Sequence, residues 1–571
     1  MAHLHKKYRS LIIGIVGIIL LTLGACKSGK DEGDSQNTFR YNVTDGIGTL
    51  DPAQAGQVAT IWAGTQLYNG LVEVDAAANV VPAIASSWTV DSTGLVWTFT
   101  LRPDVYFHEN DAFGDVGTRK VVAADVKYSF ERIMNAKTKS TGLWVFRERI
   151  LGASEYHKRS TEGGTGEIEG IKVLNDSMVS ITLVKPFAPF LSILTMPYCW
   201  IVPREAVEKY GDDFFKNPVG TGPFMFSEWR PDIKLVLKKN PRYFKKDAAG
   251  GQLPYLDGVA ISFMRDSKTE FMEFEKGSLD MVTNIDPAYA PSVLTTEGNL
   301  QGKYKQYNLL KASALSIEYY GILLNQSLEG AKNSPLANNK QLRQALNYAV
   351  NREQLVRYIL RGKGIAAKHG VLPPTMPGFN EDVKGYSYDP QKARQLLAQA
   401  GYPNGKGLPK LKLQLGNSQT TGQVAEAIQQ QWKEIGVSVE LTQVDFPQHL
   451  DMVRNSKLMM WRTNWSGDYP DPENFLALFY SANHSPGGPN TTRIHNTRLD
   501  SLYTAALNPL LSPVQRYGLY NEMERIILDE APWIFLYYNA IQRLIQPSVK
   551  GLTVDGSDRL VLETVRKEPG Q

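Results

Sequence analysis

Two carboxylates lie close together in one turn of the sequence, within the stretch "LMMWRTNWSGDYPDPENF" at positions 458–475. Asp468 and Asp471 follow an apolar, aromatic run that reaches Trp465. As a catalytic acid–base pair they would need environments that separate their pKa values, and closeness in sequence does not supply this. As calcium ligands they lack further oxygen ligands at alternating positions. Two interpretations stay open, simple turn chemistry and a clamp for a positively charged group.

Other motifs for catalysis or metal binding are missing from the sequence. The eight histidines form no H-x-x-x-H or H-E-x-x-H pair, and there is no G-x-S-x-G or Walker loop. "GTGPF" at Gly220 lacks the Lys-Ser/Thr that would hold a phosphate, so it predicts a sharp turn. Cys199 lies in the apolar stretch "MPYCWIV", which is typical of an inert core residue. We therefore expect no enzyme activity, no metal and no cofactor.

Length and composition limit the class of protein. A chain of 571 residues is longer than one hydrophobic core usually organises, so two or three lobes are expected. With 21% charged residues and a net charge of +4, nothing favours nucleic acid as a partner. Aromatic residues make up 10% of the chain, which suits a large core or a ligand cleft lined by rings.

The N-terminal segment has the pattern of a targeting sequence. A basic stretch at 5–9 precedes an uncharged apolar run at 11–23, which is too short for a stable membrane span and reads as a signal peptide. The residues "LGAC" at 23–26 resemble the cleavage box of bacterial lipoproteins, in which the cysteine is acylated. We predict a signal peptide at 1–25, a lipid anchor on Cys26 and a disordered polar tether at 26–38. An ordinary signal peptide with an incidental cysteine is the alternative.

Strand-like and helix-like segments alternate along the rest of the chain. Residues 95–101 and 234–238 read as strands, and 122–134 reads as an amphipathic helix. Asn351 with Gln354 forms a capping box, and Asp389 caps a helix that has Pro390 at its first position. A third helix is expected at 423–435, followed by a strand in "VSVELTQV". This alternation over 342–478 predicts an α/β lobe with a mixed sheet.

Eight segments in order carry a family resemblance over nearly all of residues 40–571. They are "TLDPAQ", "QLYNGLVEVD", "VPAIASSWTVDSTGLVWTFTLRPDVYFH", "AADVKYSFERIM", "NPVGTGPFMFSEW", "LRQALNYAVNREQLV", "YDPQKARQLLAQAGYP" and "NWSGDYPDPENF". Together they resemble the large extracytoplasmic solute-binding proteins of peptide ABC importers, the family 5 lipoproteins that bind oligopeptides or dipeptides.

The resemblance implies a fold and a function. The fold is an α/β two-lobed periplasmic-binding-protein clamp of type II, with mixed sheets and a discontinuous N-terminal lobe. Lobe I would be 39–314 together with 539–571, lobe II would be 315–538, and two crossovers would form the hinge. The implied function is capture of oligopeptides by a monomeric, membrane-anchored receptor outside the cytoplasm, which delivers them to a permease and its ATPase. Alternatives are a dipeptide, a metal chelate, haem or an oligosaccharide as solute, or a surface receptor without transport.

Site residues follow from the same resemblance. The aspartate matching Asp468 receives the α-ammonium of the peptide, and the tryptophan matching Trp465 lies beside it. Strand-like segments of both lobes pair with the peptide backbone, so we expect ligand contacts from Asn464 and Ser466. Asp471 is then structural, because Pro470 and Pro472 restrict the backbone around it.

Further contacts are expected at the other end of the ligand and in lobe I. In dipeptide binders an arginine would fall at about Leu415 or Gly416, and none is there. In oligopeptide binders the arginine matching Arg462 can meet the C-terminus of short peptides, which favours oligopeptides here. A surface or lobe-internal salt bridge is the alternative for Arg462. Lobe I should offer backbone at Gln57 and Val58, and Trp144 is a candidate pocket aromatic for which core packing is the alternative.

Overall fold

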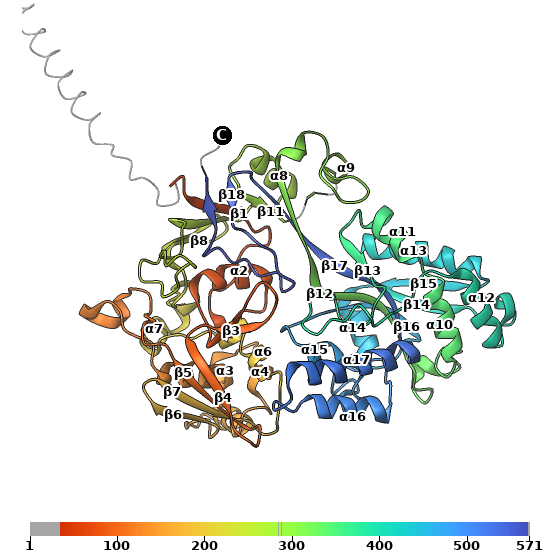
Figure 1. Ribbon diagram of the computed structural model, residues 1–571, viewed down its shortest axis with the longest axis horizontal. Coiled ribbons are helices and arrows are strands. Elements are labelled where there is room, and N and C mark those ends of the chain that lie inside the picture. The colour runs from red at the N-terminus through yellow and green to blue at the C-terminus, as the bar shows by residue number, and fades with distance from the viewer. Residues whose placement is uncertain (1–34, 284, 287, 569–571) are drawn as a thin grey trace, which may run out of the picture.

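The computed structural model describes residues 35–283, 285–286 and 288–568, and Figure 1 shows them as two bodies side by side. The predicted signal peptide, Cys26 and most of the predicted tether lie outside the described residues. Strand β1 (Thr38–Asn42) begins at the last position of the range predicted as tether. In the part of the chain that is described, no helix combines the length and the apolar character that crossing a bilayer requires.

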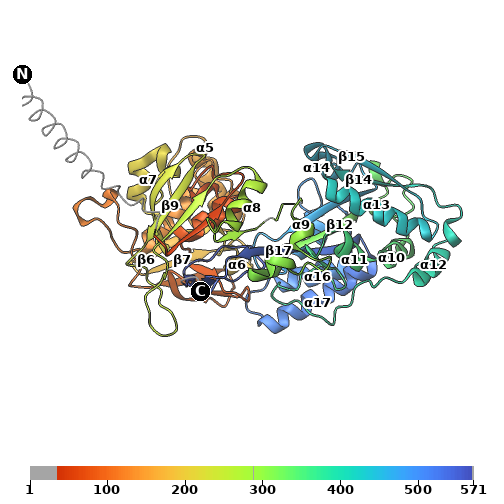
Figure 2. The same cartoon turned by 90° about the horizontal axis from the view of Figure 1, so that it is seen from above.

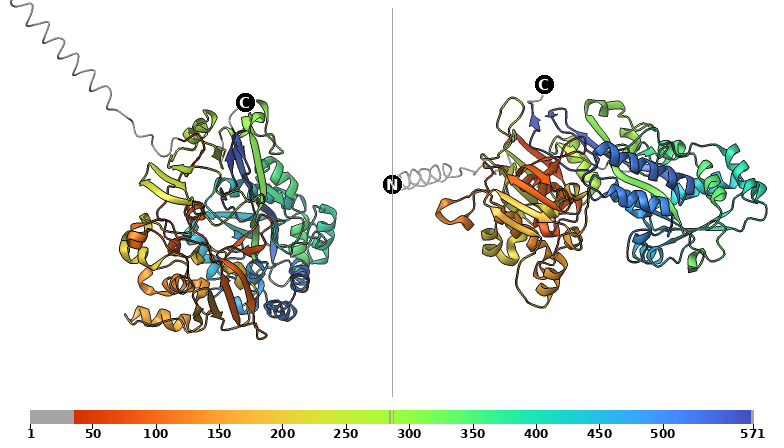
Figure 3. Two further views of the ribbon diagram at one scale, coloured as in Figure 1. Left: turned by 60° about the vertical axis from the view of Figure 1, so that its left-hand side comes forward. Right: turned by 60° about the horizontal axis from the view of Figure 1, so that its bottom comes forward.

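Two long strands connect the bodies, β12 (Asn308–Ile322) and β17 (Trp533–Ile545). They pair antiparallel along their length and pass from one body into the other (Figures 2 and 3). The pairing is regular up to Ser313 opposite Ala540 and resumes at Ile317 opposite Tyr538. The crossover positions that we predict, 314/315 and 538/539, fall in this irregular stretch. A lost register leaves the backbone fewer ladder hydrogen bonds to break when it bends.

Within the described residues, one sheet of 11 strands runs through both bodies. Its order is β15-β14-β16-β12-β17-β11-β1-β10-β9-β8, and β13 pairs with β17. The strands not yet bounded are β8 (Phe224–Arg230), β9 (Lys234–Lys239), β10 (Gly258–Ser262), β11 (Met281–Val282), β13 (Gly364–Ala366), β14 (Leu411–Gly416), β15 (Val439–Val444) and β16 (Met460–Ser466). The pairing is parallel in some places and antiparallel in others, so the predicted mixed sheet is confirmed.

The first body adds an antiparallel sheet in the order β4 (Ala85–Val90), β5 (Val96–Leu101), β7 (Met178–Thr182) and β6 (Ile171–Asn175). Hairpin β2 (Val72–Val74) and β3 (Val80–Pro82) lies beside it, and β18 (Val549–Lys550) pairs with β19 (Arg566–Lys567). The helices are α2 (Val58–Leu67), α3 (Ala123–Met134), α4 (Leu143–Phe146), α5 (Ala153–Thr161), α6 (Phe190–Ile193), α7 (Arg204–Tyr210), α8 (Ser267–Glu275) and α9 (Ala290–Val293). The strands and the helix predicted from local patterns correspond to β5, β9 and α3.

The second body places helices on both faces of its part of the sheet. They are α10 (Lys340–Tyr348), α11 (Arg352–Gln354), α12 (Pro390–Gln399), α13 (Gln419–Glu434), α14 (Phe446–Arg454), α15 (Glu473–Leu476), α16 (Thr497–Ala506) and α17 (Pro513–Glu530). Alternate residues of β12 show how the core is divided. Tyr319 packs into the core under α16 and α17, and Tyr320 packs into the core under α10, α12 and α13. The expected α/β lobe is confirmed.

The predicted caps are found, with one difference. The Asn351 side chain accepts a hydrogen bond from Gln354 N at 3.1 Å, and the Asp389 side chain accepts one from Lys392 N at 2.9 Å. The capping box predicted at Asn351 is incomplete, because the Asn351 backbone N–H donates to Gln431 Oε1 at 2.9 Å instead of to Gln354. The helix after Asn351 differs in one respect, because its second part, 355–359, has π-helical hydrogen bonding. The predicted glycine turn is confirmed as well. A β-carbon on Gly220 would lie 2.1 Å from the Leu67 carbonyl oxygen, so a larger residue would collide with the end of α2.

Candidate functional site

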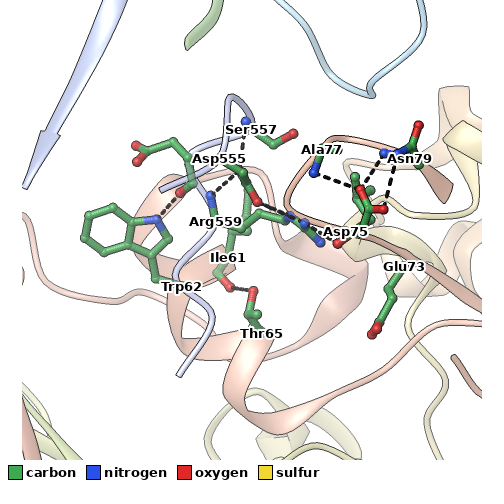
Figure 4. Close-up of polar contacts among 12 residues, drawn as sticks. Ile61, Trp62, Thr65, Glu73, Asp75, Ala77, Asn79, Asp555, Ser557 and Arg559 are labelled. Carbon is green, nitrogen blue, oxygen red and sulfur yellow. Dashed lines mark hydrogen bonds and ion pairs between the residues drawn. The ribbon is translucent and has the colours of Figure 1, made fainter. Parts of the chain in front are cut away.

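A cavity of about 790 Å³ lies between the two bodies. Its volume falls in the range of small-molecule sites. The second body contributes residues of β12, the end of β16 and the turn after it. The first body contributes one side of α2, a stacked pair of aromatic rings and the C-terminal segment 553–563, part of which is drawn in Figure 4. The lining residues used below are Val58, Tyr68, Glu73, Asp75, Trp200, Lys245, Ser316, Ser466, Asp468, Asn539, Ile541, Asp555, Asp558, Arg559 and Glu563.

Strand β16 ends at the cavity, and the turn that contains the two carboxylates follows it. It pairs antiparallel with β12, with Ser466 opposite Ser316. Beyond this pair Gly467 N donates to the Leu315 carbonyl at 2.7 Å, after which the chain leaves the sheet. The next residue, Asp468, faces the cavity. The last ladder bonds of the strand therefore determine where this carboxylate lies.

Asp468 has no cationic partner in the described part of the chain. None of its carboxylate oxygens lies within 4.0 Å of a lysine, arginine or histidine nitrogen there. The residue is exposed to the cavity, while the surrounding protein removes much of the bulk water. This burial raises the pKa of the carboxyl group above its usual range, and a hydrogen bond with the Asn474 side chain opposes the rise. A cation that enters the cavity would therefore stabilise the ionised form of this carboxylate.

Asn474 holds Asp468 and Trp465 in fixed positions. Its Oδ1 accepts hydrogen bonds from Trp465 Nε1 at 3.1 Å and from Asp468 N at 3.2 Å. The side chain is buried at the start of α15. Sequence reasoning missed this residue, because nothing in the local pattern shows that one amide oxygen joins a strand tryptophan to a turn aspartate.

Asp471 has the opposite environment. It is 1% exposed, forms an ion pair with Arg516 Nη2 at 2.5 Å, and accepts a hydrogen bond from Glu473 N at 3.0 Å. Tyr520 Oη lies 3.4 Å from the same carboxylate. All of these partners belong to the second body, so Asp471 fixes the turn to α17. This agrees with the structural role expected from the sequence.

Arg462 does not line the cavity. Its Nη2 lies 2.6 Å from Glu318 Oε2, across the β12–β16 pair, and the Glu318 side chain is 7% exposed. His449 Nε2 lies 2.8 Å from the Arg462 carbonyl oxygen. The lobe-internal salt bridge that the sequence left open is the arrangement found here. The charge of Arg462 is therefore already paired with a carboxylate of the second body.

The remaining predicted contacts of the second body are found near the end of β16. Ser466 lines the cavity and its Oγ lies 3.3 Å from Ser316 Oγ. Asn464 is exposed, and its Nδ2 donates to Ser466 Oγ at 3.4 Å, but it does not line the cavity. Trp465 packs partly into the core of the second body. Ser466 therefore joins Asp468 at the cavity, with Trp465 one residue behind it.

In the first body, one predicted contact out of three lines the cavity. Val58, at the start of α2, is 52% exposed and lines the cavity. Gln57 precedes it as the helix cap without a side-chain bond, and does not line the cavity. Trp144 is 37% exposed but does not line the cavity, and the guanidinium of Arg149 lies 5.8 Å from its ring.

The wall formed by the first body contains features that the sequence did not reveal. Tyr68 and Trp200 stack with ring centroids 5.6 Å apart, which gives a flat apolar surface. Lys245 Nζ lies 2.6 Å from Glu73 and 3.1 Å from Glu563. These contacts join residues that are far apart in the chain, so no local motif could have shown them.

Charges around the cavity favour a cationic group. Arg559 binds Asp555 at 2.9 Å and the Val74 carbonyl at 2.6 Å, as Figure 4 shows beside the turn at Asp75. Both cations of the lining, Lys245 and Arg559, are thus already paired with carboxylates. The acidic residues of the lining are Glu73, Asp75, Asp468, Asp555, Asp558 and Glu563. Negative potential in a concave site attracts positive groups.

No metal site accompanies the cavity. Across the described ranges no three histidine, cysteine or carboxylate side chains lie close enough together to hold a metal ion. Cys199 is buried, and burial raises the pKa of its thiol, which keeps it protonated and unreactive.

Two lobes joined by two strands around a cavity are the architecture of a solute-binding clamp. The chain belongs to the bacterial extracellular solute-binding proteins, family 5, whose middle region it matches over residues 79–487. It is therefore a solute-binding receptor of the ABC transporter type and not an enzyme. The two-lobed fold predicted from the resemblance is confirmed.

Relatives cover almost the whole chain. It is 28% identical to the dipeptide-binding protein of Escherichia coli K12 over 96% of this chain and 95% of that protein. It is 30% identical to heme-binding protein A of Haemophilus influenzae over 90% of each.

Solved structures share the fold. The periplasmic murein tripeptide-binding protein MppA, in its unliganded open form, matches with a TM-score of 0.79 at 24% identity over 93% of this chain and 97% of that one. DppA of Helicobacter pylori, in complex with the peptide STSA, matches with a TM-score of 0.68 at 26% identity over 93% and 98%.

Proposed function

We propose that the protein binds peptides with a free N-terminus in the cavity between its lobes and delivers them to an ABC permease. The observation that carries this proposal is Asp468, a carboxylate that faces the cavity without a cationic partner among the described residues. The names of relatives support it, because the E. coli protein is called dipeptide-binding and the H. pylori protein was crystallised with a peptide.

A peptide α-ammonium would supply the cationic hydrogen-bond donor that the Asp468 carboxylate lacks. A charge-assisted hydrogen bond in a cavity with little water is stronger than one between neutral groups. Asn474 accepts hydrogen bonds from the Asp468 backbone N–H and from the Trp465 indole N–H, which holds both residues at the end of β16. Pairing of the peptide backbone near Ser466 and Val58 would give affinity that does not depend on side chains, which suits a receptor with many ligands.

The ligand class proposed is oligopeptides rather than dipeptides. A dipeptide carries its carboxylate close to its ammonium, so the receptor would need a free cation near Asp468. Lys245 and Arg559 are both paired in the cavity wall, and Arg462 is paired with Glu318. A longer peptide can carry its carboxylate away from these acidic surroundings, towards water.

The setting of the receptor follows the sequence signals. We propose removal of 1–25, lipid attachment at Cys26 and a tether that leaves a monomeric clamp free outside the cytoplasm. Lobe I would be 39–314 with 539–571 and lobe II would be 315–538, so that both hinge crossings lie in β12 and β17. The permease and its ATPase are the expected partners.

Calorimetric titration of the chain from Lys27, refolded to remove bound ligand, tests the proposal. Tri- to pentapeptides with free and with acetylated N-termini would be compared on the wild type and on Asp468→Asn. We expect binding that acetylation abolishes. Asp468→Asn should weaken binding by about 2–5 kcal/mol, because the ammonium then enters the cavity unpaired.

Asp212→Asn is the matched control, since Asp212 is an exposed aspartate outside the cavity. It should bind like the wild type. Equal affinity for free and acetylated peptides would contradict the assignment of Asp468. If no peptide bound and haem bound tightly, haem would replace peptides as the proposed ligand.

A further inference from the structure

Strand β17 presents alternate residues to two different hollows. Asn539 and Ile541 line the cavity between the lobes, whereas Tyr538 lines a second pocket of about 540 Å³. Gln542 donates from its Nε2 to the Gly362 carbonyl at 3.1 Å, beside this second pocket. Because successive side chains of a strand point to opposite faces, the second pocket lies on the reverse side of the hinge strands from the cavity.

The two lobes touch on this reverse side. Glu297, before β12 in the chain, forms an ion pair with Arg357, after it, with Oε1 and Nη2 2.7 Å apart. Thr296 Oγ1 donates to the same Glu297 carboxylate at 2.9 Å, which orients it. Glu297 and Arg357 both line the second pocket. The ion pair therefore spans the gap between the lobes behind the hinge.

Two glycines bring the backbones of the lobes together at the same place. Gly298 and Gly362 both have φ of +75°, and a β-carbon on Gly362 would lie 2.9 Å from Gly298 Cα. Lys311 of β12 donates from Nζ to the Gly298 carbonyl and lies opposite Gln542 in the β12–β17 ladder. We call Glu297, Gly298, Arg357 and Gly362 the rear contact.

We propose that the rear contact holds the lobes in their open arrangement and sets ligand affinity by opposing closure. Rotation about β12 and β17 that narrows the cavity must widen the reverse side, so Glu297 separates from Arg357 and Gly298 separates from Gly362. Another link between the lobes, Ala188 N to the Leu507 carbonyl at 2.8 Å, joins loops elsewhere and is not part of this contact. The proposal rests on the proposed function only in assuming that ligand favours closure.

The energetic argument is one of populations. A ligand that binds the closed form has an apparent dissociation constant equal to the intrinsic constant divided by the closed fraction. Contacts made only in the open form lower that fraction and weaken binding without touching the ligand. An exposed ion pair is a weak contact, so its removal should have a modest effect, and charge reversal a larger one.

Arg357→Ala and Arg357→Glu test the proposal, with trialanine titrated by calorimetry as ligand. We expect about threefold tighter binding for Arg357→Ala and about tenfold for Arg357→Glu, which places two carboxylates together. The double variant Glu297→Arg with Arg357→Glu should return to the wild-type affinity. Arg498→Ala is the control, because Arg498 and Glu522 form an equally exposed pair at 2.8 Å inside lobe II.

Small-angle X-ray scattering without ligand separates this proposal from the proposed function. Arg357→Glu should have a smaller radius of gyration than the wild type and the Arg498→Ala control, whether or not trialanine binds to any of them. An unchanged radius would overturn the proposal. Affinity that is unchanged or weaker in both Arg357 variants, with wild-type binding intact, would overturn it as well.

Discussion

The two ends of the turn from Gly467 to Glu473 give their carboxylates different environments. At the cavity end Asp468 has one amide side chain as its partner and no cation in the described structure. At the core end Asp471 is buried with Arg516 and receives a backbone N–H and a tyrosine hydroxyl. Both carboxylates belong to one short motif, and their surroundings alone separate their roles.

The difference teaches which carboxylate can act on a ligand. A buried charge that already has a partner contributes to the position of the turn, and removing the partner costs several kcal/mol. A carboxylate that faces a cavity without a cationic partner is stabilised when a ligand brings a cation into the cavity. The comparison supports a structural role for Asp471 and the proposed ligand-binding role for Asp468.

The largest effect should come from breaking the core end. Arg516→Ala leaves the Asp471 carboxylate buried and unpaired, so the free energy of unfolding should fall by about 3–5 kcal/mol. Urea denaturation followed by circular dichroism would measure it. Arg498→Ala, at an exposed pair, should change stability by less than about 1 kcal/mol. If the two variants were equally stable, Asp471 would not be the structural carboxylate.

The next largest effect concerns acid. Burial raises the pKa of Asp468 above the ordinary value of about 3.9, while the peptide ammonium stays charged throughout this range. Lowering the pH through the raised pKa protonates the carboxyl group, so affinity should fall by up to about tenfold per pH unit. The fall should begin at higher pH than for an ordinary aspartate.

Titrations of one peptide from pH 7 down to pH 4 would measure this dependence. Asp468→Asn has no group to protonate there and should show weak binding that does not vary with pH in this manner. A wild-type affinity that stays constant over the range would argue against an ionised Asp468 as the ammonium partner.

The smallest effect should come from the residue that orients the cavity end. Asn474→Ala removes the acceptor shared by Trp465 and Asp468, so peptide affinity should fall by about tenfold while the fold remains. Trp465 fluorescence should shift, because its indole N–H loses its partner. Asn455→Ala is the control, since among the described residues the side chain of Asn455 bonds only to Asp451, one turn away. Loss of affinity without a change in fluorescence would contradict the role of Asn474 as the shared acceptor that holds Trp465 and Asp468.

Sequence patterns predicted those parts of the fold that depend on neighbours in the chain. The caps at Asn351 and Asp389 were predictable because the capping side chain and its backbone partner are three residues apart. Strand 95–101 was predictable because alternation gives one buried face. The order of eight family segments then predicted the two-lobed architecture, which no single segment could do.

Contacts between distant residues could not be predicted in this way. For Arg462 the sequence left a ligand contact and a lobe-internal salt bridge open, and it could not show that Glu318, 144 residues away in the chain, is the ion-pair partner. The stacked rings of Tyr68 and Trp200 come from a helix end and a loop. Contacts of this kind depend on how helices and strands pack against one another. A single sequence does not show which of many possible residues a given side chain will contact.

The single sheet that runs through both lobes has a consequence for the order of folding. Strand β17 lies between β12 and β11, so the first lobe cannot complete its sheet until the chain has been made as far as Ile545. Gln546 meets Phe274 across 272 residues of sequence, and all of the second lobe lies between them. Closing so long a loop is a slow, entropically costly step. The second lobe, whose elements follow one another between β12 and β17, should be structured first, and the first lobe should complete its sheet on it.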